Sequence, residues 1–288
     1  MTTIGKQVFN GCTAMTDVEI PETITSIGYA AFSECAALKN LVLPASLKTL
    51  EGNAFYNCKG LTEVVLPNSV TDVGASAFYG CSALTNVTLS TSMQTLNNNV
   101  FSGCSKLSHI DIPSSVNTIS SGAFQKCSSL TKVFIPDGVT QIGEQAFYQC
   151  IKLAEVTIGA NVQSVGPKAF YNCLALTSVT CQGETPPETP GNAETFTMSV
   201  YETAVLYVPA TAFHAYKNSG IWPWFKHIET IVEIPPRDPN GDGEINISDV
   251  SAIIDIILHA GDDAAGDVND DGEVNIADIN VIIDLILM

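Results

Sequence analysis

A repeat of 23 residues runs through the first two-thirds of the chain and limits what the chain can fold into. Eight cysteines recur at this spacing, and a phenylalanine stands three residues before each of them. The repeated cysteines are Cys12, Cys35, Cys58, Cys81, Cys104, Cys127, Cys150 and Cys173. A fixed period of this length indicates a solenoid, in which each copy completes its core by stacking on its neighbours.

Each copy also contains a short run of alternating apolar residues, as at Val133 and Ile135, which in most copies ends at a proline such as Pro136. The alternation predicts one strand per copy, and therefore a parallel sheet that grows along the solenoid. The pair Ile142 and Gly143, like its equivalents, predicts a turn that needs a permissive backbone. The segment Ala-Phe-x-x-Cys predicts one tight helical or 3₁₀ turn packed inward.

The cysteines occupy one equivalent inward position in every copy. This placement predicts a ladder of buried free thiols that act as small apolar side chains. Disulfides between neighbouring copies are the alternative, if stacking brings the Cα atoms within about 6 Å. Such pairing would break the equivalence of the copies, and no Cys-x-x-Cys pair or Cys/His cluster indicates zinc.

The repeat resembles the BspA-like leucine-rich repeats, whose pattern is Ala-Phe-x-x-Cys-x-x-Leu-x-x-Val-x-Ile-Pro-x-x-Val-x-x-Ile-Gly. The resemblance covers residues 1–181. Ser90 and Gly159 replace the proline, and Glu51, Asn97 and Ser120 replace the glycine. The resemblance implies an α/β repeat solenoid, a leucine-rich-repeat right-handed superhelix with a parallel sheet, on a microbial surface and engaged in adhesion or protein binding.

The period fails after Cys181, and residues 182–234 are expected to cap the solenoid. A proline-rich loop is followed by a ninth strand at residues 206–209, displaced by a four-residue insertion. Trp222 and Trp224 are interpreted as an aromatic plug that covers the open end, and stacking on a ligand is the alternative use of both. Residues 235–237 form a short stiff linker to a domain at residues 238–288.

Residues 238–249 recur 29 positions later as residues 267–278. Both segments place oxygen-bearing side chains at positions one, three, five and twelve and glycine at position six, as calcium loops do. The pattern predicts two calcium ions, and the alternative is a turn rich in Asp and Asn without an ion. The predicted ligands are Asp238, Asn240, Asp242, the Glu244 carbonyl and Asp249, then Asp267, Asn269, Asp271, the Glu273 carbonyl and Asp278.

A predicted helix follows each loop, at residues 249–259 and 278–288. Two loop–helix units in tandem resemble a type I dockerin, and this resemblance implies a cohesin-type protein partner. Dockerins of cellulose-degrading assemblies carry Ser-Thr at loop positions ten and eleven, where this chain has Ile247-Ser248 and Ile276-Ala277. The basic residues usual further along those helices are also absent. A calcium-locked terminal clasp packed against the solenoid is the competing interpretation.

The net charge of −18 is concentrated in this last domain. Residues 238–288 hold 13 acidic and no Lys or Arg residues, whereas the other 237 residues hold 17 acidic against 12 basic ones. The charge argues against nucleic acid as a partner, and no apolar run reaches transmembrane length. Clustered carboxylates repel one another without metal, so calcium binding should be coupled to folding. Extracellular calcium levels would keep the loops loaded, which favours secretion or the cell surface.

Residue 1 falls in the middle of a repeat, so we expect a cap, a signal peptide or further copies to precede it. We expect no enzyme, because the four histidines are scattered and no nucleophile–base set is present.

The outward positions of the strands vary from copy to copy, as a face that carries specificity would. The candidate ligand-binding residues on that face are Val42, Val65, His109, Asp111, Lys132 and Phe134. The sequence therefore predicts an extracellular adhesion protein that binds a protein or glycan and assembles through its dockerin-like domain. The alternatives are a structural scaffold stabilised by calcium and a non-catalytic part of a polysaccharide-degrading system, and the oligomeric state stays open.

Overall fold

The computed structural model describes residues 2–189, 194–231, 247–258, 274 and 276–286. The chain divides into two compact units, Met1–Ile231 and Val232–Met288, and each is described by itself. Among the described residues, no helix is long and apolar enough to cross a membrane.

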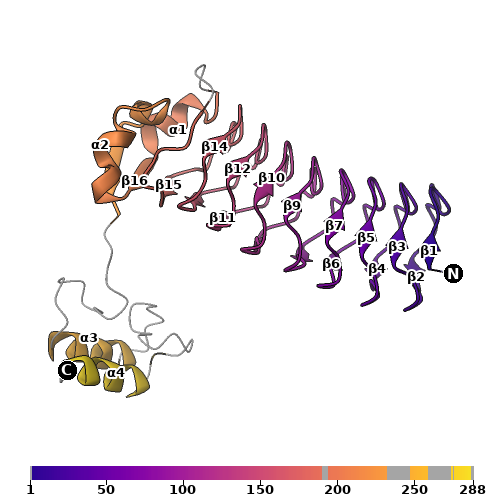
Figure 1. Ribbon diagram of the computed structural model, residues 1–288, viewed down its shortest axis with the longest axis horizontal. Coiled ribbons are helices and arrows are strands. Elements are labelled where there is room, and N and C mark those ends of the chain that lie inside the picture. Colours follow the sequence, from indigo (N-terminus) through magenta and orange to yellow (C-terminus); the bar gives the residue numbers. More distant parts are fainter. Residues whose placement is uncertain (1, 190–193, 232–246, 259–273, 275, 287–288) are drawn as a thin grey trace. The chain divides into compact units, whose positions relative to one another are not determined.

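The first unit is a solenoid of stacked coils, and Figure 1 shows them side by side from β1 to the C-terminal cap. Strands follow the alternating apolar runs and pair in parallel, with each residue facing its equivalent 23 positions on, as Lys132 faces Glu155. The predicted parallel-sheet solenoid is confirmed. The strands of this first series are β2 (Asp17–Val18), β4 (Asn40–Leu41), β6 (Glu63–Val65), β8 (Asn86–Thr88), β11 (Lys132–Ile135), β13 (Glu155–Ile158) and β15 (Ser178–Cys181).

A second series of short strands ends at the Ile of each Ile-Gly pair, so a strand stands where the sequence predicted a turn, and the turn begins only after the glycine. Each coil pairs with the coil before it, as Ile142 pairs with Ile119, and the amide of Gly143 donates to the Ile119 carbonyl at 2.7 Å. The strands of the second series are β1 (Thr3–Ile4), β3 (Ser26–Ile27), β5 (Thr49–Leu50), β7 (Asp72–Val73), β9 (Thr95–Leu96), β10 (Thr118–Ile119), β12 (Gln141–Ile142) and β14 (Ser164–Val165).

Glycine after these strands allows neighbouring coils to approach closely. A Cβ on Gly143 would lie 2.6 Å from the amide nitrogen of Ser121, which is a steric clash. At two of the three positions where another residue stands, its side chain bonds to the preceding coil: Glu51 accepts from the Tyr29 amide at 2.8 Å, and Asn97 Nδ2 donates to the Val73 carbonyl at 2.8 Å. The second series splits beside Asn97, between β7 and β9.

The Ala-Phe-x-x-Cys segment forms successive β-turns, where the sequence predicted a helical or 3₁₀ turn. Two residues per coil, four apart, have left-handed backbone angles, as at Gly122 (φ 66°) and Lys126 (φ 61°). These angles interrupt the helical path. The amides then alternate in direction: Cys127 donates to the Phe124 carbonyl in its own coil, and Phe124 donates to Ala146 in the next coil at 2.8 Å.

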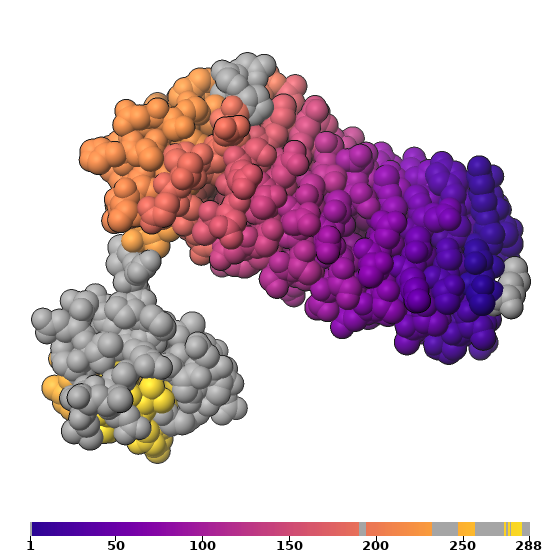
Figure 2. Space-filling view, in the orientation of Figure 1, coloured from indigo at the N-terminus to yellow at the C-terminus, as the bar shows by residue number. Residues whose placement is uncertain are grey.

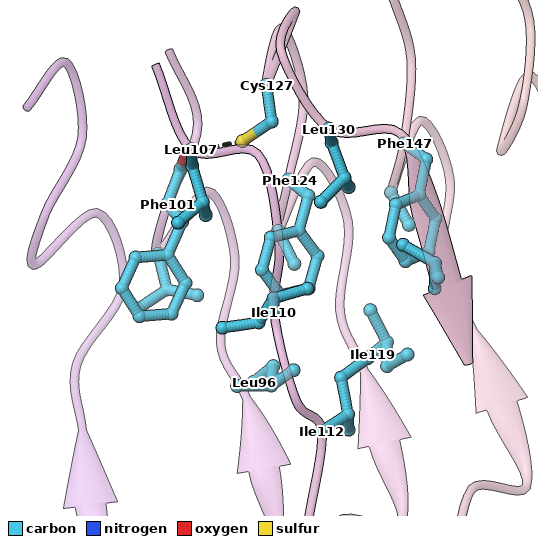
Figure 3. Packing of buried hydrophobic residues seen from close by; sticks show 14 of the residues in the cluster. Leu96, Phe101, Leu107, Ile110, Ile112, Ile119, Phe124, Cys127, Leu130 and Phe147 are labelled. Carbon is cyan, nitrogen blue, oxygen red and sulfur yellow. Dashed lines mark hydrogen bonds between the residues drawn. The ribbon is translucent and has the colours of Figure 1, made fainter. Parts of the chain in front are cut away.

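The core lies inside the coils and consists of stacked ladders of equivalent residues. Phenylalanine rings from Phe9 to Phe170 stack with centroids 5.1 to 5.7 Å apart, and Phe196 extends the stack at 5.3 Å. Figure 3 shows Phe101, Phe124 and Phe147 in this arrangement, with aliphatic residues above and below the rings. In the space-filling view (Figure 2), successive coils pack directly against one another. Each inner coil is therefore buried on both sides by copies of itself.

The cysteines form the predicted ladder of buried thiols. All nine, each of which the structure describes, are free, and all except Cys12 are buried. From Cys35 to Cys173, each Sγ donates to the carbonyl of the phenylalanine one coil earlier at 3.1 to 3.3 Å. Burial raises the pKa of Cys58, Cys127 and Cys173 to about 12, so these thiols stay protonated at neutral pH.

The C-terminal end of the solenoid is covered by a cap. Its strand β16 (Val205–Val208) pairs with β15 through Leu206 and Val179, 27 residues apart, as the four-residue insertion requires. The other elements of the cap are α1 (Met198–Thr203), η1 (Ala210–Ala212), α2 (Phe213–Tyr216), η2 (Trp222–Trp224) and β17 (His227–Thr230), which pairs with β16.

Aromatic rings close the stack beneath this cap. Phe196 meets the edges of Tyr201, Trp222 and Phe225. Trp222 is fully buried and its Nε1 donates to the Pro187 carbonyl at 3.0 Å, so stacking of Trp222 on a ligand is ruled out. Trp224 remains about half exposed.

The described part of the second unit consists of two packed helices, α3 (Ile247–Leu258) and α4 (Ile276–Ile286). Each begins two residues earlier than the sequence predicted. Ile253 and Ile282 are fully buried between them, and Val250 is nearly so.

Candidate functional sites

Asp249 and Asp278, the predicted twelfth residues of the two calcium loops, lie in the first turns of α3 and α4. Both side chains are fully buried. A helix N-terminus favours a carboxylate, but one this deeply buried also needs an opposite charge or hydrogen-bond donors nearby. Two equivalent buried carboxylates therefore fit the terminal ligand of a hard, oxygen-seeking cation such as calcium.

The other eight predicted ligands lie outside the described residues: Asp238, Asn240, Asp242, Glu244, Asp267, Asn269, Asp271 and Glu273. Within the described part of the chain, no group of three or more His, Cys, Asp or Glu residues is placed to hold a metal ion. The ligand set therefore stays a prediction, for which Asp249 and Asp278 supply the structural support.

The two helices also expose equivalent isoleucines. Ile247 and Ile276, at loop position ten, are each 69% exposed. Ile254 and Ile283, seven residues further along, are 41% and 37% exposed. The sequence showed the first pair as a departure from the Ser-Thr pattern, but it could not show that both pairs reach the surface.

The outward face of the first strand series carries two separate groups of candidate residues. Val42 and Val65, 76% and 49% exposed, line a groove of about 490 Å³ together with Lys39, Asn40 and Glu63. Most of its lining residues are apolar, and one basic and one acidic side chain are among the others.

The second group lies further along the same face. His109 and Asp111 form a hydrogen bond of 2.8 Å within residues 107–113, which carry no strand. In the next coil Lys132 pairs with Glu155 at 3.0 Å, and Phe134 is 52% exposed. Thr88 and its coil separate Val65 from Asp111, so the six predicted residues form two patches.

The sequence did not predict a polar groove of about 810 Å³ near the cap. It forms where residues 185–188, expected to be a loop, return beside β14: the Val165 amide donates to the Glu188 carbonyl at 2.9 Å. Asp137, Asn161 and Thr185 also line it, but Asp137 already accepts a hydrogen bond from the Ala160 amide. Only the return of the chain creates this groove, and no local pattern signals that return.

Comparison with known families identifies both modules. Residues 2–131 and 117–187 match the BspA type leucine rich repeat region, in six copies. Residues 236–287 match the dockerin type I domain. The chain therefore belongs to the BspA-type leucine-rich-repeat family and carries a C-terminal dockerin type I domain.

Three solved structures similar to the chain are bacterial leucine-rich-repeat proteins. A leucine-rich repeat protein from Bacteroides ovatus is 24% identical, with 73% of this chain and 74% of that chain covered and a TM-score of 0.46. TpLRR from T. pallidum is 27% identical, with 61% and 71% covered and a TM-score of 0.43. The pneumococcal vaccine antigen PcpA is 18% identical, with 81% and 71% covered and a TM-score of 0.41. No curated protein matches.

The two families together define a general role. Both are typically non-catalytic modules of binding and assembly and are typically extracellular or at the cell surface. Type I dockerins generally bind calcium, and a dockerin implies a protein partner.

Proposed function

We propose that this chain is a secreted or cell-surface binding protein that recognises a protein or glycan on its repeat sheet and attaches to a cohesin-type receptor through its dockerin domain. The observation that carries the proposal is the combination in one chain. A rigid solenoid with a uniform core and a variable outward face is joined to a duplicated loop–helix domain with buried carboxylates at both predicted loop ends.

Two calcium ions, one in each loop, hold the dockerin domain in this arrangement. The side chains of Asp249 and Asp278 close the two loops as the last oxygen ligands of each ion.

Calorimetric titration of calcium into metal-free full-length protein tests the site, and we expect two equivalents. Asp249→Asn and Asp278→Asn each remove one equivalent. Asp255→Asn, an exposed position of α3 outside the loops, is the matched control and retains both. Fewer than two equivalents in the unaltered protein would remove one loop from the proposal.

Ligand recognition on the sheet centres on the groove at Val42 and Val65. Apolar lining residues beside Lys39 and Glu63 suit a protein side chain or a sugar ring with polar substituents. His109, Asp111, Lys132 and Phe134 form a second contact patch further along the face.

A glycan and matrix-protein array probed with the full-length protein tests recognition on the sheet. Val42→Asp weakens capture at least tenfold, because a charge replaces an apolar side chain in the lining of the groove. Val8→Asp, an exposed valine in the first coil outside this strand series, does not. Equal capture by both variants would exclude the groove.

The second candidate function is a purely structural scaffold in which calcium locks the terminal domain. The full burial of Asp249 and Asp278 favours it equally, since either role needs the ions. A non-catalytic role in a polysaccharide-degrading system is a further alternative, in which the dockerin domain does attach to a receptor. Pull-down with recombinant cohesins separates them, because a scaffold captures none.

A further inference from the structure

The polar groove of about 810 Å³ near the cap has no part in the function proposed above. Its walls are residues of the segments 137–140 and 160–164, from two neighbouring coils, and of the returning segment 185–188. The Glu188 amide donates to the Gln163 carbonyl at 2.7 Å, and the Val165 amide donates to the Glu188 carbonyl at 2.9 Å. Backbone hydrogen bonds therefore hold the walls together, and the groove is formed before any ligand arrives.

Two side chains of the groove are already held in position. Asp137 Oδ1 accepts from the Ala160 amide at 2.6 Å, and Asn161 Nδ2 donates to the Asp137 carbonyl at 3.0 Å. Each bond uses only part of the side chain, so the second oxygen of Asp137 and the side-chain oxygen of Asn161 remain open to a ligand. A ligand that bonds to these oxygens does not have to order the two side chains, which lowers the entropic cost of binding.

Other polar side chains of the groove are uncommitted. The lining side chains without a hydrogen-bond partner among the described residues are those of Gln163, Ser164, Thr185 and Glu188. The carboxylate only accepts hydrogen bonds, whereas the hydroxyls and the amide both donate and accept. The groove therefore offers donors and acceptors side by side.

This mixture of groups decides which ligand fits. The described residues that line the groove include no Lys or Arg, and Asp137 and Glu188 are acidic, so an anionic ligand is repelled. A cationic side chain from a protein presents donors only and would leave the hydroxyl and amide donors of the groove desolvated without an acceptor. A sugar hydroxyl both donates and accepts, so it pairs with either kind of group.

The size of the groove suits a ligand of several linked units. Its volume lies within the range of about 300 to 1,000 Å³ that is usual for ligand pockets. A second hollow of about 440 Å³ adjoins it, because Ser164 and Glu188 line both. The described lining of this second hollow also contains no Lys, Arg or aromatic residue. An elongated ligand can therefore pass Glu188 from one hollow into the other.

We propose that the groove near the cap binds a neutral oligosaccharide, with Asp137, Asn161 and Glu188 accepting hydrogen bonds from its hydroxyls. This inference goes beyond the proposed function, because none of the residues that line the groove belongs to the first strand series, which carries Val42 and Val65. The described lining contains no aromatic side chain, so affinity comes from hydrogen bonds rather than from stacking on a sugar ring.

Calorimetric titration of neutral hexasaccharides of glucose, xylose and mannose into calcium-loaded full-length protein tests the site. We expect at least one of them to bind and an anionic hexasaccharide of galacturonic acid not to bind. The double variant Asp137→Asn/Glu188→Gln keeps the shape of both side chains. It should weaken binding at least tenfold, because hydrogen bonds to charged acceptors become hydrogen bonds to neutral ones.

Glu22→Gln is the matched control. Glu22 is an exposed acidic residue that stands 115 residues, or five repeats, before Asp137 and outside the lining of the groove. This variant should bind as the unaltered protein does. Thr185→Val removes one hydroxyl and keeps the side-chain shape, so it should weaken binding about threefold and replaces the double variant if that does not fold. The midpoint temperature of solenoid unfolding shows which variants are folded.

Binding of a neutral hexasaccharide that the double variant loses supports the proposal, and four results would overturn it. The first is that no neutral hexasaccharide binds at 10 mM. The second is equal binding by the unaltered protein and the variants, which would place the sugar elsewhere. Tighter binding of a hexapeptide of lysine than of every sugar would assign the groove to a basic protein segment. A third equivalent of calcium that the double variant loses would assign it to a cation.

Discussion

The two units both consist of duplicated sequence, but the copies stabilise each other by different means. In the solenoid, every inner coil is covered on both sides by its equivalents, which stack aromatic, aliphatic and thiol rungs and share backbone hydrogen bonds. In the described part of the second unit, the buried apolar residues are Val250, Ile253 and Ile282, and they are accompanied by two buried carboxylates. Repetition therefore builds a continuous core in the first unit, whereas for the second unit the proposed function adds calcium to the small core that the structure describes.

Removal of calcium should produce the largest difference in stability between the two units. A ligand at 1,000 times its dissociation constant stabilises the folded state by about 4 kcal/mol per site. We expect a chelator to unfold the dockerin domain and to leave the solenoid folded. Circular dichroism during heating should show two transitions with calcium, of which only one depends on it. If the midpoint temperature of the solenoid transition also changed with calcium, the result would instead support a calcium-locked clasp packed against the solenoid.

Loss of one phenylalanine rung should have the next largest effect. Phe124 is fully buried between Phe101 and Phe147. Phe124→Ala should lower the free energy of unfolding by about 3 to 5 kcal/mol, because it leaves a cavity inside the stack. Phe134→Ala, an exposed phenylalanine of the neighbouring strand β11, should cost less than about 0.5 kcal/mol. Urea unfolding measures the free energy of unfolding of both variants. Equal decreases would contradict a stabilising role for the buried phenylalanine stack.

Alkaline pH should weaken the solenoid through its thiols. Burial raises the pKa of Cys127 from 9.0 to about 12, so the folded state keeps the proton that the unfolded state releases. The thiol's contribution to stability is present below pH 9 and is lost as the pH rises toward 12. At pH 10, each such thiol should lower the free energy of unfolding by on the order of 1 kcal/mol relative to neutral pH.

Urea unfolding between pH 8 and pH 10.5 measures this dependence. Cys127→Ala should reduce the slope of the unfolding free energy against pH by the share of one thiol. Cys12→Ala, which alters the one cysteine that is partly exposed, serves as the control. If the unaltered protein and both variants had the same slope, the pH dependence would not come from the buried thiol of Cys127.

Part of the fold could be predicted because residues that occupy equivalent positions in the repeat share one structural environment. Whatever buries Phe124 in one copy buries Phe101 in another, so the inward ladders and the first strand series follow from periodicity. The same alternation predicted that Val42, Val65 and Phe134 point outward, and they are exposed. The period does not identify the ligand of these residues, because recognition depends on positions that differ between copies.

The rest escaped prediction for definite physical reasons. Strands of two residues, such as Ser26–Ile27, are too short to show alternation, and the glycine that follows them equally suits a turn. The polar groove near the cap depends on the return of residues 185–188 to β14, a long-range contact. The spacing of the loops predicts the metal ligands without any tertiary contact, and of the ten predicted ligands the structure describes Asp249 and Asp278, both buried.

The left-handed positions were also missed, and they allow the smallest and most local test. They recur four residues apart in each coil, yet Gln7, Ala30, Ser76 and Lys126 occupy some of them, so composition does not reveal them. A Cβ costs about 1 to 2 kcal/mol in this conformation, and glycine costs about 0.5 to 1 kcal/mol in chain entropy. Gln149, with φ 60°, therefore offers a small net gain on replacement by glycine.

Gln149→Gly should raise the free energy of unfolding by about 0.5 kcal/mol. Lys152→Gly in the same coil, outside the left-handed positions, gains nothing from relief of strain and should lower it by about as much. Urea unfolding of the two variants side by side measures the difference of about 1 kcal/mol. Two variants of equal stability would mean that stacking relieves the strain elsewhere in the coil. Opposite signs would show that each coil tolerates strained turns because its neighbours hold its amides in place.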